Sequence, residues 1–182
     1  MKRIFLTAGH HNRDSGAIGN GYQENNLTKE LRDMITVKLR EIACLKIWND
    51  DDNDTLAQVI AKINQLATTD DFLLEIHFDS ADRTAASGTT ALVAKGARSQ
   101  SKDFASQLAN DVAVIVGITN RGVKDETESN RGRLGILHTK ASSCLLEIAF
   151  ISNPSDMQKY QIYKESLALA IATTIRDTML KY

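Results

Sequence analysis

The order of apolar and polar positions along the chain predicts strands and helices in alternation. Short apolar runs that end at glycine or polar residues predict strands, and apolar residues that recur every three or four positions predict amphipathic helices. The predicted strands are residues 3–7, 45–48, 72–78, 88–94, 136–138 and 144–150. The predicted helices are residues 27–42, 56–66, 99–117 and a C-terminal segment that includes 167–179.

This alternation, in a chain with only one proline, predicts an α/β fold whose sheet is covered by helices on both sides. The run "FLLEIHF" at 72–78 is almost continuously apolar, which is typical of a central strand buried on both faces. Residues 120–135 are polar and contain glycines, so we expect a loop there. Because no repeat or linker interrupts the pattern, we expect one domain over residues 1–182.

Composition and charge exclude several classes of protein. The apolar fraction of 42% and the charged fraction of 25% are ordinary for a globular chain. With a net charge of −1 and no basic stripe, we expect no nucleic-acid binding, and no apolar run is long enough to span a membrane. The N-terminal apolar stretch is too short for a signal peptide, so we expect synthesis in the cytoplasm. An export signal missing from this sequence would instead make the protein extracellular or periplasmic.

Two further features have ordinary interpretations. Cys44 and Cys144 lie far apart, so we expect two buried free thiols rather than a disulfide. The acidic run at 49–54 has the alternate aspartates of a calcium loop, but Thr55 and Ala61 replace the Gly and Glu that such a loop requires. We interpret this run as a solvated turn that caps the following helix.

Two polar residues lie where the pattern predicts buried strands. His77 is in "FLLEIHF" and Glu147 is in "CLLEIAF", each near the C-terminal end of its strand. An ionised carboxylate among apolar side chains is costly unless it is paired. Ligand sites of open α/β sheets gather at the C-terminal edge of the strands. The two residues therefore indicate that a shared cation or reaction stabilises both.

The segment "LTAGHHNRDSGAIGNGYQE", residues 6–24, adds His10 at the end of the first strand and Glu24 at the start of a helix. Its glycines make the loop flexible enough to fold back over the sheet edge. Two imidazoles and a carboxylate form a preferred ligand set for catalytic Zn²⁺, so His10, Glu24 and His77 are candidate ligands. Glu147 beside them is a candidate general base and acid. The alternatives are a histidine that only hydrogen-bonds within the fold and a glutamate that complements a helix dipole.

Four segments resemble a known family in the family's own order. They are "FLTAGHHNRDSGAIGNGYQE", "EIHFDSA", "NRGVK" and "LLEIAFISNPSDM". They resemble, in turn, four segments of the Amidase_3 N-acetylmuramoyl-L-alanine amidases. These are the zinc loop, the S-I-H-x-N-A strand end, a loop with the same five-residue sequence and the segment that holds the catalytic glutamate. Together they span most of the chain.

The resemblance implies a twisted, mixed six-stranded sheet with helices on both faces. It also implies that His10, Glu24 and His77 bind Zn²⁺ and that Glu147 is the catalytic carboxylate. The expected reaction is hydrolysis of the amide between N-acetylmuramic acid and L-alanine in peptidoglycan. The chain departs from the family pattern near the site, where it has the residues Thr7, Ala8, His11, Asn12, Glu75, Asp79 and Ala149. None of these removes a ligand, but they alter the groove that receives the substrate.

Several alternatives remain open. His11 either lies at the pocket rim or supports a ligand, or has no role in the site. His138 either binds substrate or assists proton transfer, or is structural. Glu75 either orients His77 or replaces Glu147 as the reacting carboxylate. The alternative functions are a zinc peptidase or deacylase acting on another amide, and a non-catalytic wall-binding module that retains the fold. We expect a monomer that acts on the cell wall after release, either as a phage or prophage lysis enzyme or as a bacterial remodelling enzyme.

Overall fold

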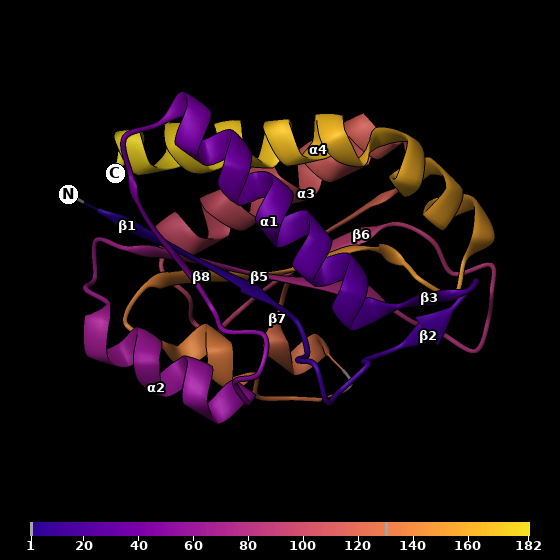
Figure 1. Cartoon of the computed structure of the whole chain (residues 1–182), viewed down its shortest axis with the longest axis horizontal. Coiled ribbons are helices and arrows are strands. Elements are labelled where there is room, and N and C mark those ends of the chain that lie inside the picture. The colour runs from indigo at the N-terminus through magenta and orange to yellow at the C-terminus, as the bar shows by residue number, and fades with distance from the viewer. Residues whose placement is uncertain (1, 130) are drawn as a thin grey trace.

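A mixed six-stranded sheet lies at the centre of the computed structural model, which describes residues 2–129 and 131–182 (Figure 1). The strand order is β4-β1-β5-β8-β6-β7. Strand β6 runs antiparallel to β8, whereas the other neighbouring pairs are parallel. The strands of this sheet are β1 (Arg3–Ala8), β4 (Lys46–Asn49), β5 (Phe72–Asp79), β6 (Thr89–Val93), β7 (Asn120–Asp125) and β8 (Ser142–Phe150).

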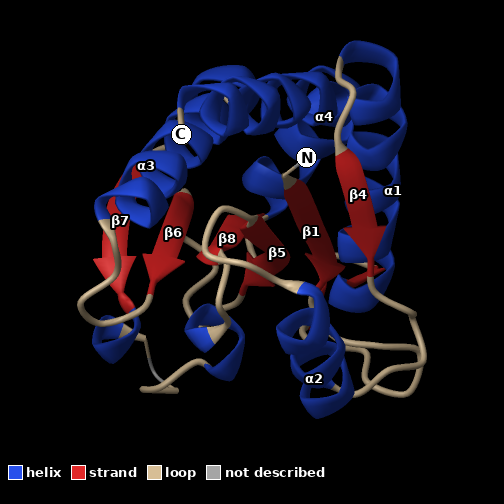
Figure 2. Cartoon of the chain, turned by 90° about the vertical axis from the view of Figure 1, so that its left-hand side faces the viewer, coloured by secondary structure: helices blue, strands red, loops and turns tan. Residues whose placement is uncertain are grey.

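The helices form two layers of unequal size. Figure 2 shows α1, α3 and α4 on one side of the sheet and α2 on the other. A short 3₁₀ helix packs beside α2, and a two-stranded hairpin precedes α1. The bounds are α1 (Glu24–Ile42), α2 (Leu56–Leu66), α3 (Ser99–Val116), α4 (Pro154–Lys181), β2 (Ile18–Gly19), β3 (Tyr22–Gln23) and the 3₁₀ helices Glu126–Glu128 and Gly135–His138.

The central strands divide their apolar residues between the two layers. Successive side chains of a strand point to opposite faces of the sheet. Leu74 and Leu146 therefore join the core under α1, α3 and α4, whereas Leu73 and Leu145 pack on the side of α2. Because both faces are covered, β5 needs apolar residues at almost every position, as its sequence predicted.

Among the helices of the described residues, none combines the length and apolarity that crossing a bilayer requires.

The prediction of a six-stranded mixed α/β sheet is confirmed, but one strand was assigned to the wrong segment. Residues 136–138 form part of a 3₁₀ helix rather than a strand, because Ile136 and Leu137 are buried against the α2 layer without joining the sheet. The sixth strand is β7, within the segment 120–135 that was predicted to be a loop. Strand β7 lies at the sheet edge and pairs only with β6, so it lacks the apolar run that identifies a buried strand.

Two predictions about ordinary features also need correction. Cys144 is a buried free thiol as expected, but Cys44 is exposed in the segment after α1. The acidic run is not simply a solvated turn, because Asp50 is buried and forms an ion pair with Arg32 of α1 at 2.9 Å. The residue that caps α2 is Thr55, whose side chain and that of Gln58 form a capping box.

Candidate functional site

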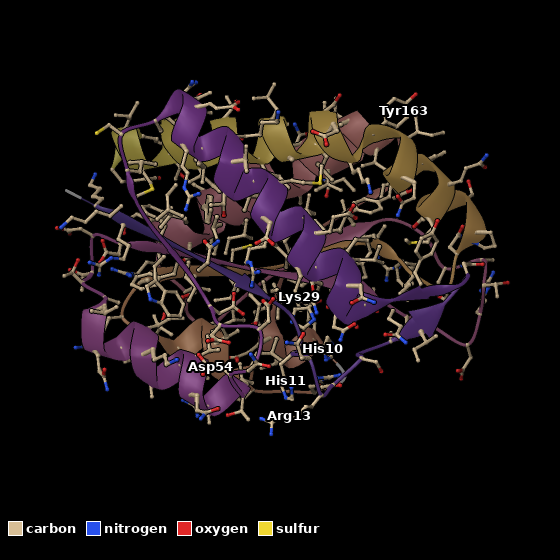
Figure 3. All side chains as sticks on the ribbon, in the orientation of Figure 1. His10, His11, Arg13, Lys29, Asp54 and Tyr163 are labelled. Atoms are coloured by element: carbon tan, nitrogen blue, oxygen red, sulfur yellow. The ribbon has the colours of Figure 1, made fainter. Side chains whose placement is uncertain are left out.

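The turn after β1 places His10 at the C-terminal edge of the sheet. Figure 3 shows His10, His11 and Arg13 on this turn, below Lys29 of α1. The backbone of His10 has the left-handed φ of 71°, which is uncommon outside glycine. Helix α1 stabilises this conformation, because the Thr28 hydroxyl donates to the carbonyl of Gly9 at 2.8 Å and the Asn25 side chain donates to that of His11 at 3.2 Å.

The carboxylate of Glu24 lies between the two imidazoles. Glu24 is the first residue of α1, and its Oε2 lies 3.0 Å from His10 Nε2. Its Oε1 lies 2.9 Å from Nδ1 of His77, which comes from the end of β5. Backbone amides of Ala17 and Phe78 also donate to this carboxylate, at 2.8 and 3.0 Å. The three side chains come from distant parts of the chain and meet at one point.

The geometry of this cluster fits a metal ion. One donor atom from each of His10, Glu24 and His77 lies within 4.8 Å of the other two. Two imidazole nitrogens and one carboxylate oxygen are the donor set of many catalytic zinc sites, with a fourth position left for water or substrate. The structure therefore brings together the three residues that the sequence indicated.

Two glycines make room for the imidazole rings. A Cβ atom at Gly9 would lie 2.4 Å from Cε1 of His77. A Cβ atom at Gly16 would lie 2.5 Å from Cδ2 of His10 and 2.6 Å from Oε2 of Glu24, and the φ of Gly16 is +63°. The close approach of backbone to ligand side chains thus requires glycine at both positions.

Two further carboxylates contact the outer nitrogens of the histidines. Asp14 Oδ2 lies 2.9 Å from His10 Nδ1, and Glu75 Oε2 lies 3.8 Å from His77 Nε2. Such partners fix the orientation of ligand imidazoles. Sequence reasoning noted Glu75 on the same strand face as His77 but missed Asp14. The only available signal was the spacing of four residues from His10, in a loop where an aspartate is unremarkable.

The charges of the cluster shift the pKa of each member. Burial raises the pKa of Glu24, but hydrogen bonds from His10 and His77 outweigh burial and hold it well below its usual range. Burial lowers the pKa values of His10 and His77, yet their carboxylate partners raise both above the ordinary value. Both imidazoles therefore bind protons tightly, and an incoming cation has to displace those protons.

Glu147 lies beside this cluster on β8. It is the direct cross-strand partner of His77, and its Oε2 is buried without a hydrogen-bond partner among the described residues. Burial raises the pKa of Glu147 to about 7. A carboxyl group that titrates near neutrality can both accept and donate a proton, which is what a general base and acid requires.

The cluster opens into a cleft of about 860 Å³. His11 lines the cleft, whereas His138 lies apart from it with Nε2 at 2.8 Å from Oε1 of the buried Glu126. Glu126 also accepts hydrogen bonds from the backbone amides of Lys95 and Leu134. His138 thus contacts, from the protein surface, a hydrogen-bond network around the buried Glu126, which supports the structural interpretation of this residue.

The ion pair of Arg32 and Asp50 supports the same edge of the sheet. Asp50 accepts a hydrogen bond from the backbone amide of Ala8 at 3.2 Å, at the end of β1. Arg32 contacts Asp50 and Asp52, at 2.9 and 2.7 Å. Glu24, Thr28 and Arg32 are spaced four residues apart, so they lie on one face of α1. This face contacts β1, the turn after it and the acidic run.

Comparison with known proteins places the chain in a family. Residues 4–177 match the family model Amidase_3, described as N-acetylmuramoyl-L-alanine amidase. The chain belongs to this family. The resemblance drawn from the four sequence segments is therefore confirmed.

Proteins that are named N-acetylmuramoyl-L-alanine amidase are similar to the chain in sequence or in structure. The amidase LytC of Bacillus subtilis (strain 168) is 32% identical over 172 residues, which are 92% of this chain but only 34% of LytC. The catalytic domain of the amidase CwlV from Bacillus (Paenibacillus) polymyxa var. colistinus has a TM-score of 0.79 at 25% identity, covering 100% of this chain and 98% of that one. The amidase AmiC2 of Nostoc punctiforme has a TM-score of 0.83 at 20% identity with the same coverage, which shows the shared fold alone.

Proposed function

We propose that this chain is a Zn²⁺-dependent amidase domain that hydrolyses the bond between N-acetylmuramic acid and L-alanine in peptidoglycan. The observation that carries the proposal is the cluster of His10, Glu24 and His77 beside Glu147 at the edge of an open cleft. Membership of the family supports the substrate, and the ligand geometry supports the ion.

In this proposal His10, Glu24 and His77 hold the ion, and Asp14 and Glu75 orient the two imidazoles. When bound, Zn²⁺ supplies Lewis-acid polarisation of a carbonyl group and increases the acidity of water. Glu147 accepts the proton of the attacking water and then donates it to the amide nitrogen as the C–N bond breaks. The amine that leaves is the amino group of L-alanine, and the water oxygen remains in the carboxyl group of the lactyl ether.

The test compares purified peptidoglycan after incubation with zinc-loaded wild type, Glu147→Gln and His77→Gln. We expect wild type to release peptides that begin with L-alanine, detected by mass spectrometry. Glu147→Gln should lower the rate by about 10²–10⁴-fold while it retains the metal, because it removes only the proton acceptor. His77→Gln should lose both metal and activity. Glu165→Gln on the exposed face of α4 is the matched control and should behave as wild type.

Each alternative function has its own outcome in this test. A zinc peptidase or deacylase would bind zinc but leave the lactyl amide intact. A wall-binding module would sediment with peptidoglycan without releasing peptide. Full activity in Glu147→Gln would refute the role of Glu147 even if the wall is cleaved.

We further propose that the domain acts on the cell wall after leaving the cytoplasm. The support is the substrate class that the family name indicates. Fractionation of producing cells with an antibody against the chain tests this proposal. Protein retained entirely in the cytoplasm, including during lysis, would contradict it.

A further inference from the structure

Strand β7 contains a bulge close to the cleft. Thr89 of β6 pairs with Asn120, whereas Ala91 pairs with Val123, so three steps along β7 match two steps along β6. The extra residue is accommodated at Gly122, which has a φ of +86° and whose amide donates to Oδ1 of Asn120 at 2.9 Å. A bulge of this kind changes the face to which the neighbouring side chains point.

The bulge brings two cations to the same wall of the cleft. In a regular strand, residues three apart point to opposite faces of the sheet. Here both Arg121 and Lys124 line the cleft, while Val123 packs against the main core on the other face. The Arg121 guanidinium lies over the ring of Phe150, with 4.9 Å between its carbon and the ring centroid, which limits its freedom.

Arg121 and Lys124 differ from two cations that are paired with carboxylates of the cleft lining. Arg32 and Lys62 form ion pairs with Asp50 and Asp54. The ion pairs found among the described residues include neither Arg121 nor Lys124.

Other charged groups face the same part of the cleft. Arg131 adds a third cation, and the carboxylates that line the cleft near these cations include Asp79, Glu128 and Glu147. Glu128 accepts a hydrogen bond from the backbone amide of Asp125 within a capping box, so part of its hydrogen-bonding capacity is already used. Because the ion pairs of the described residues involve neither Arg121 nor Lys124, these two cations are available to an anion in the cleft.

We propose that Arg121 and Lys124 bind the free α-carboxylate of the second residue of the stem peptide. This inference rests on the proposed function. In peptidoglycan that residue is a D-glutamate joined through its side chain, so its α-carboxyl group is left as a carboxylate or as an amide. Arginine and lysine recognise a carboxylate by charge-assisted hydrogen bonds, which an amide cannot replace.

The distances across the sheet agree with this assignment. Strands β8 and β7 flank β6, so their axes are two strand spacings apart, about 10 Å. Two extended residues span about 7 Å, and the long side chains of Arg121 and Lys124 cover the remainder. A stem peptide whose first amide lies at Glu147 therefore extends across β6 toward β7.

The experiment uses two substrates that differ in one group. They are N-acetylmuramoyl-L-alanyl-D-glutamate with its γ-carboxyl group blocked as an N-methylamide and its α-carboxylate free, and the same compound with an α-carboxamide. For zinc-loaded wild type we expect kcat/KM to be about tenfold higher with the carboxylate, since hydrogen bonds to charged groups are worth about that much or more. In the double variant Arg121→Gln/Lys124→Gln this ratio should fall close to one. The control Arg40→Gln/Lys46→Gln changes two exposed cations outside the cleft and should keep the wild-type ratio.

A binding measurement gives an answer that does not depend on catalysis. The product L-alanyl-D-glutamate γ-N-methylamide, with a free α-carboxylate, is titrated calorimetrically into the zinc-loaded proteins. We expect weaker binding to the double variant than to wild type or to the control. Equal treatment of the two substrates by wild type, or product binding unaffected in the double variant, would overturn the assignment. If wild type cleaves neither substrate, the proposed function fails, and the product titration still decides whether this wall binds the carboxylate.

Discussion

At the scale of single residues, the site depends on glycines as much as on its ligands. The loop before α1 contains two glycines with left-handed backbones, Gly16 at +63° and Gly21 at +80°. A Cβ atom at Gly16 would collide with His10 and Glu24, whereas one at Gly21 would meet nothing within 4 Å. An alanine at either position would strain the backbone, but only an alanine at Gly16 would also crowd the candidate ligands.

We predict that Gly16→Ala abolishes zinc binding and that Gly21→Ala retains it. Both variants carry the strain of a left-handed alanine, about 1–2 kcal/mol, but only Gly16→Ala forces the ligand side chains apart. Zinc content after dialysis, together with urea unfolding, measures the two effects separately. Equal zinc content in the two variants would contradict the role assigned to Gly16.

The residues that sequence reasoning found are those whose chemistry conflicts with their surroundings. His77 and Glu147 are recognisable because they interrupt apolar strands. His10 and Glu24 are recognisable because they lie at the two ends of a glycine-rich loop. Asp14 was missed because it lies in a polar loop, where an aspartate needs no special explanation. Its contact with His10 depends on how the loop folds back, and no local pattern encodes that contact.

At the scale of elements, the packing of α3 places two aspartates in opposite environments. Burial raises the pKa of Asp111, which accepts a hydrogen bond from Thr174 of α4. Hydrogen bonds from Tyr182 and Lys181 lower the pKa of Asp103, whose side chain is half-exposed. The two groups should therefore affect stability with opposite dependence on pH.

We predict that Asp111→Asn has a higher melting temperature than wild type at pH 7. At pH 3 the difference between the two melting temperatures should be smaller. A carboxyl group whose pKa is raised by folding favours the folded state below its unfolded pKa, and this contribution is lost as pH rises through the folded value. The change should be a few degrees at most, because 1 kcal/mol corresponds to about 2–4 °C in a domain of this size. Calorimetry across this pH range provides the measurement.

Asp103→Asn is the control on the same helix, and the sign of its effect is reversed. A carboxyl group with a lowered pKa contributes stability above its unfolded pKa, and this contribution is lost as pH falls through the folded value. The control should therefore lower the melting temperature at pH 7 and have less effect at pH 3. The same sign for both variants would show that burial of Asp111 is not the dominant influence.

Elements whose burial leaves a periodic pattern were predictable, and the edge strand was not. Helices α1 to α4 each show apolar residues at helical spacing, and β5 shows the apolar run of a strand covered on both sides. Strand β7 has the sequence "NRGVKD" and is held by pairing with β6 and by the bulge at Gly122. Because the backbone makes the hydrogen bonds that hold β7 in the sheet, its side chains do not show the apolar pattern that identifies a strand.

At the scale of the whole molecule, the candidate metal site joins parts of the fold that move apart on unfolding. His10 follows β1, Glu24 begins α1 and His77 belongs to β5. An ion bound to all three is bound to the folded state alone. Metal affinity and stability are therefore linked quantities.

We predict that zinc added at about 100 times its dissociation constant stabilises the protein by about 2.7 kcal/mol. For a domain of this size, that free energy corresponds to a rise in melting temperature of about 5–10 °C. Differential scanning calorimetry of chelator-treated protein, with and without zinc, measures the shift. His77→Gln should show little shift, and an equal shift in that variant would place the bound ion elsewhere.

The separation of the three donors along the polypeptide also determines when the ion can be acquired. In a motif such as H-E-x-x-H, two donors lie one helical turn apart, so a short peptide already offers part of the site. Here β1 and β5 have to pair and α1 has to dock before all three donors are neighbours. A nascent or translocating chain would therefore remain apoprotein, and loading would follow folding in whichever compartment the sheet is completed.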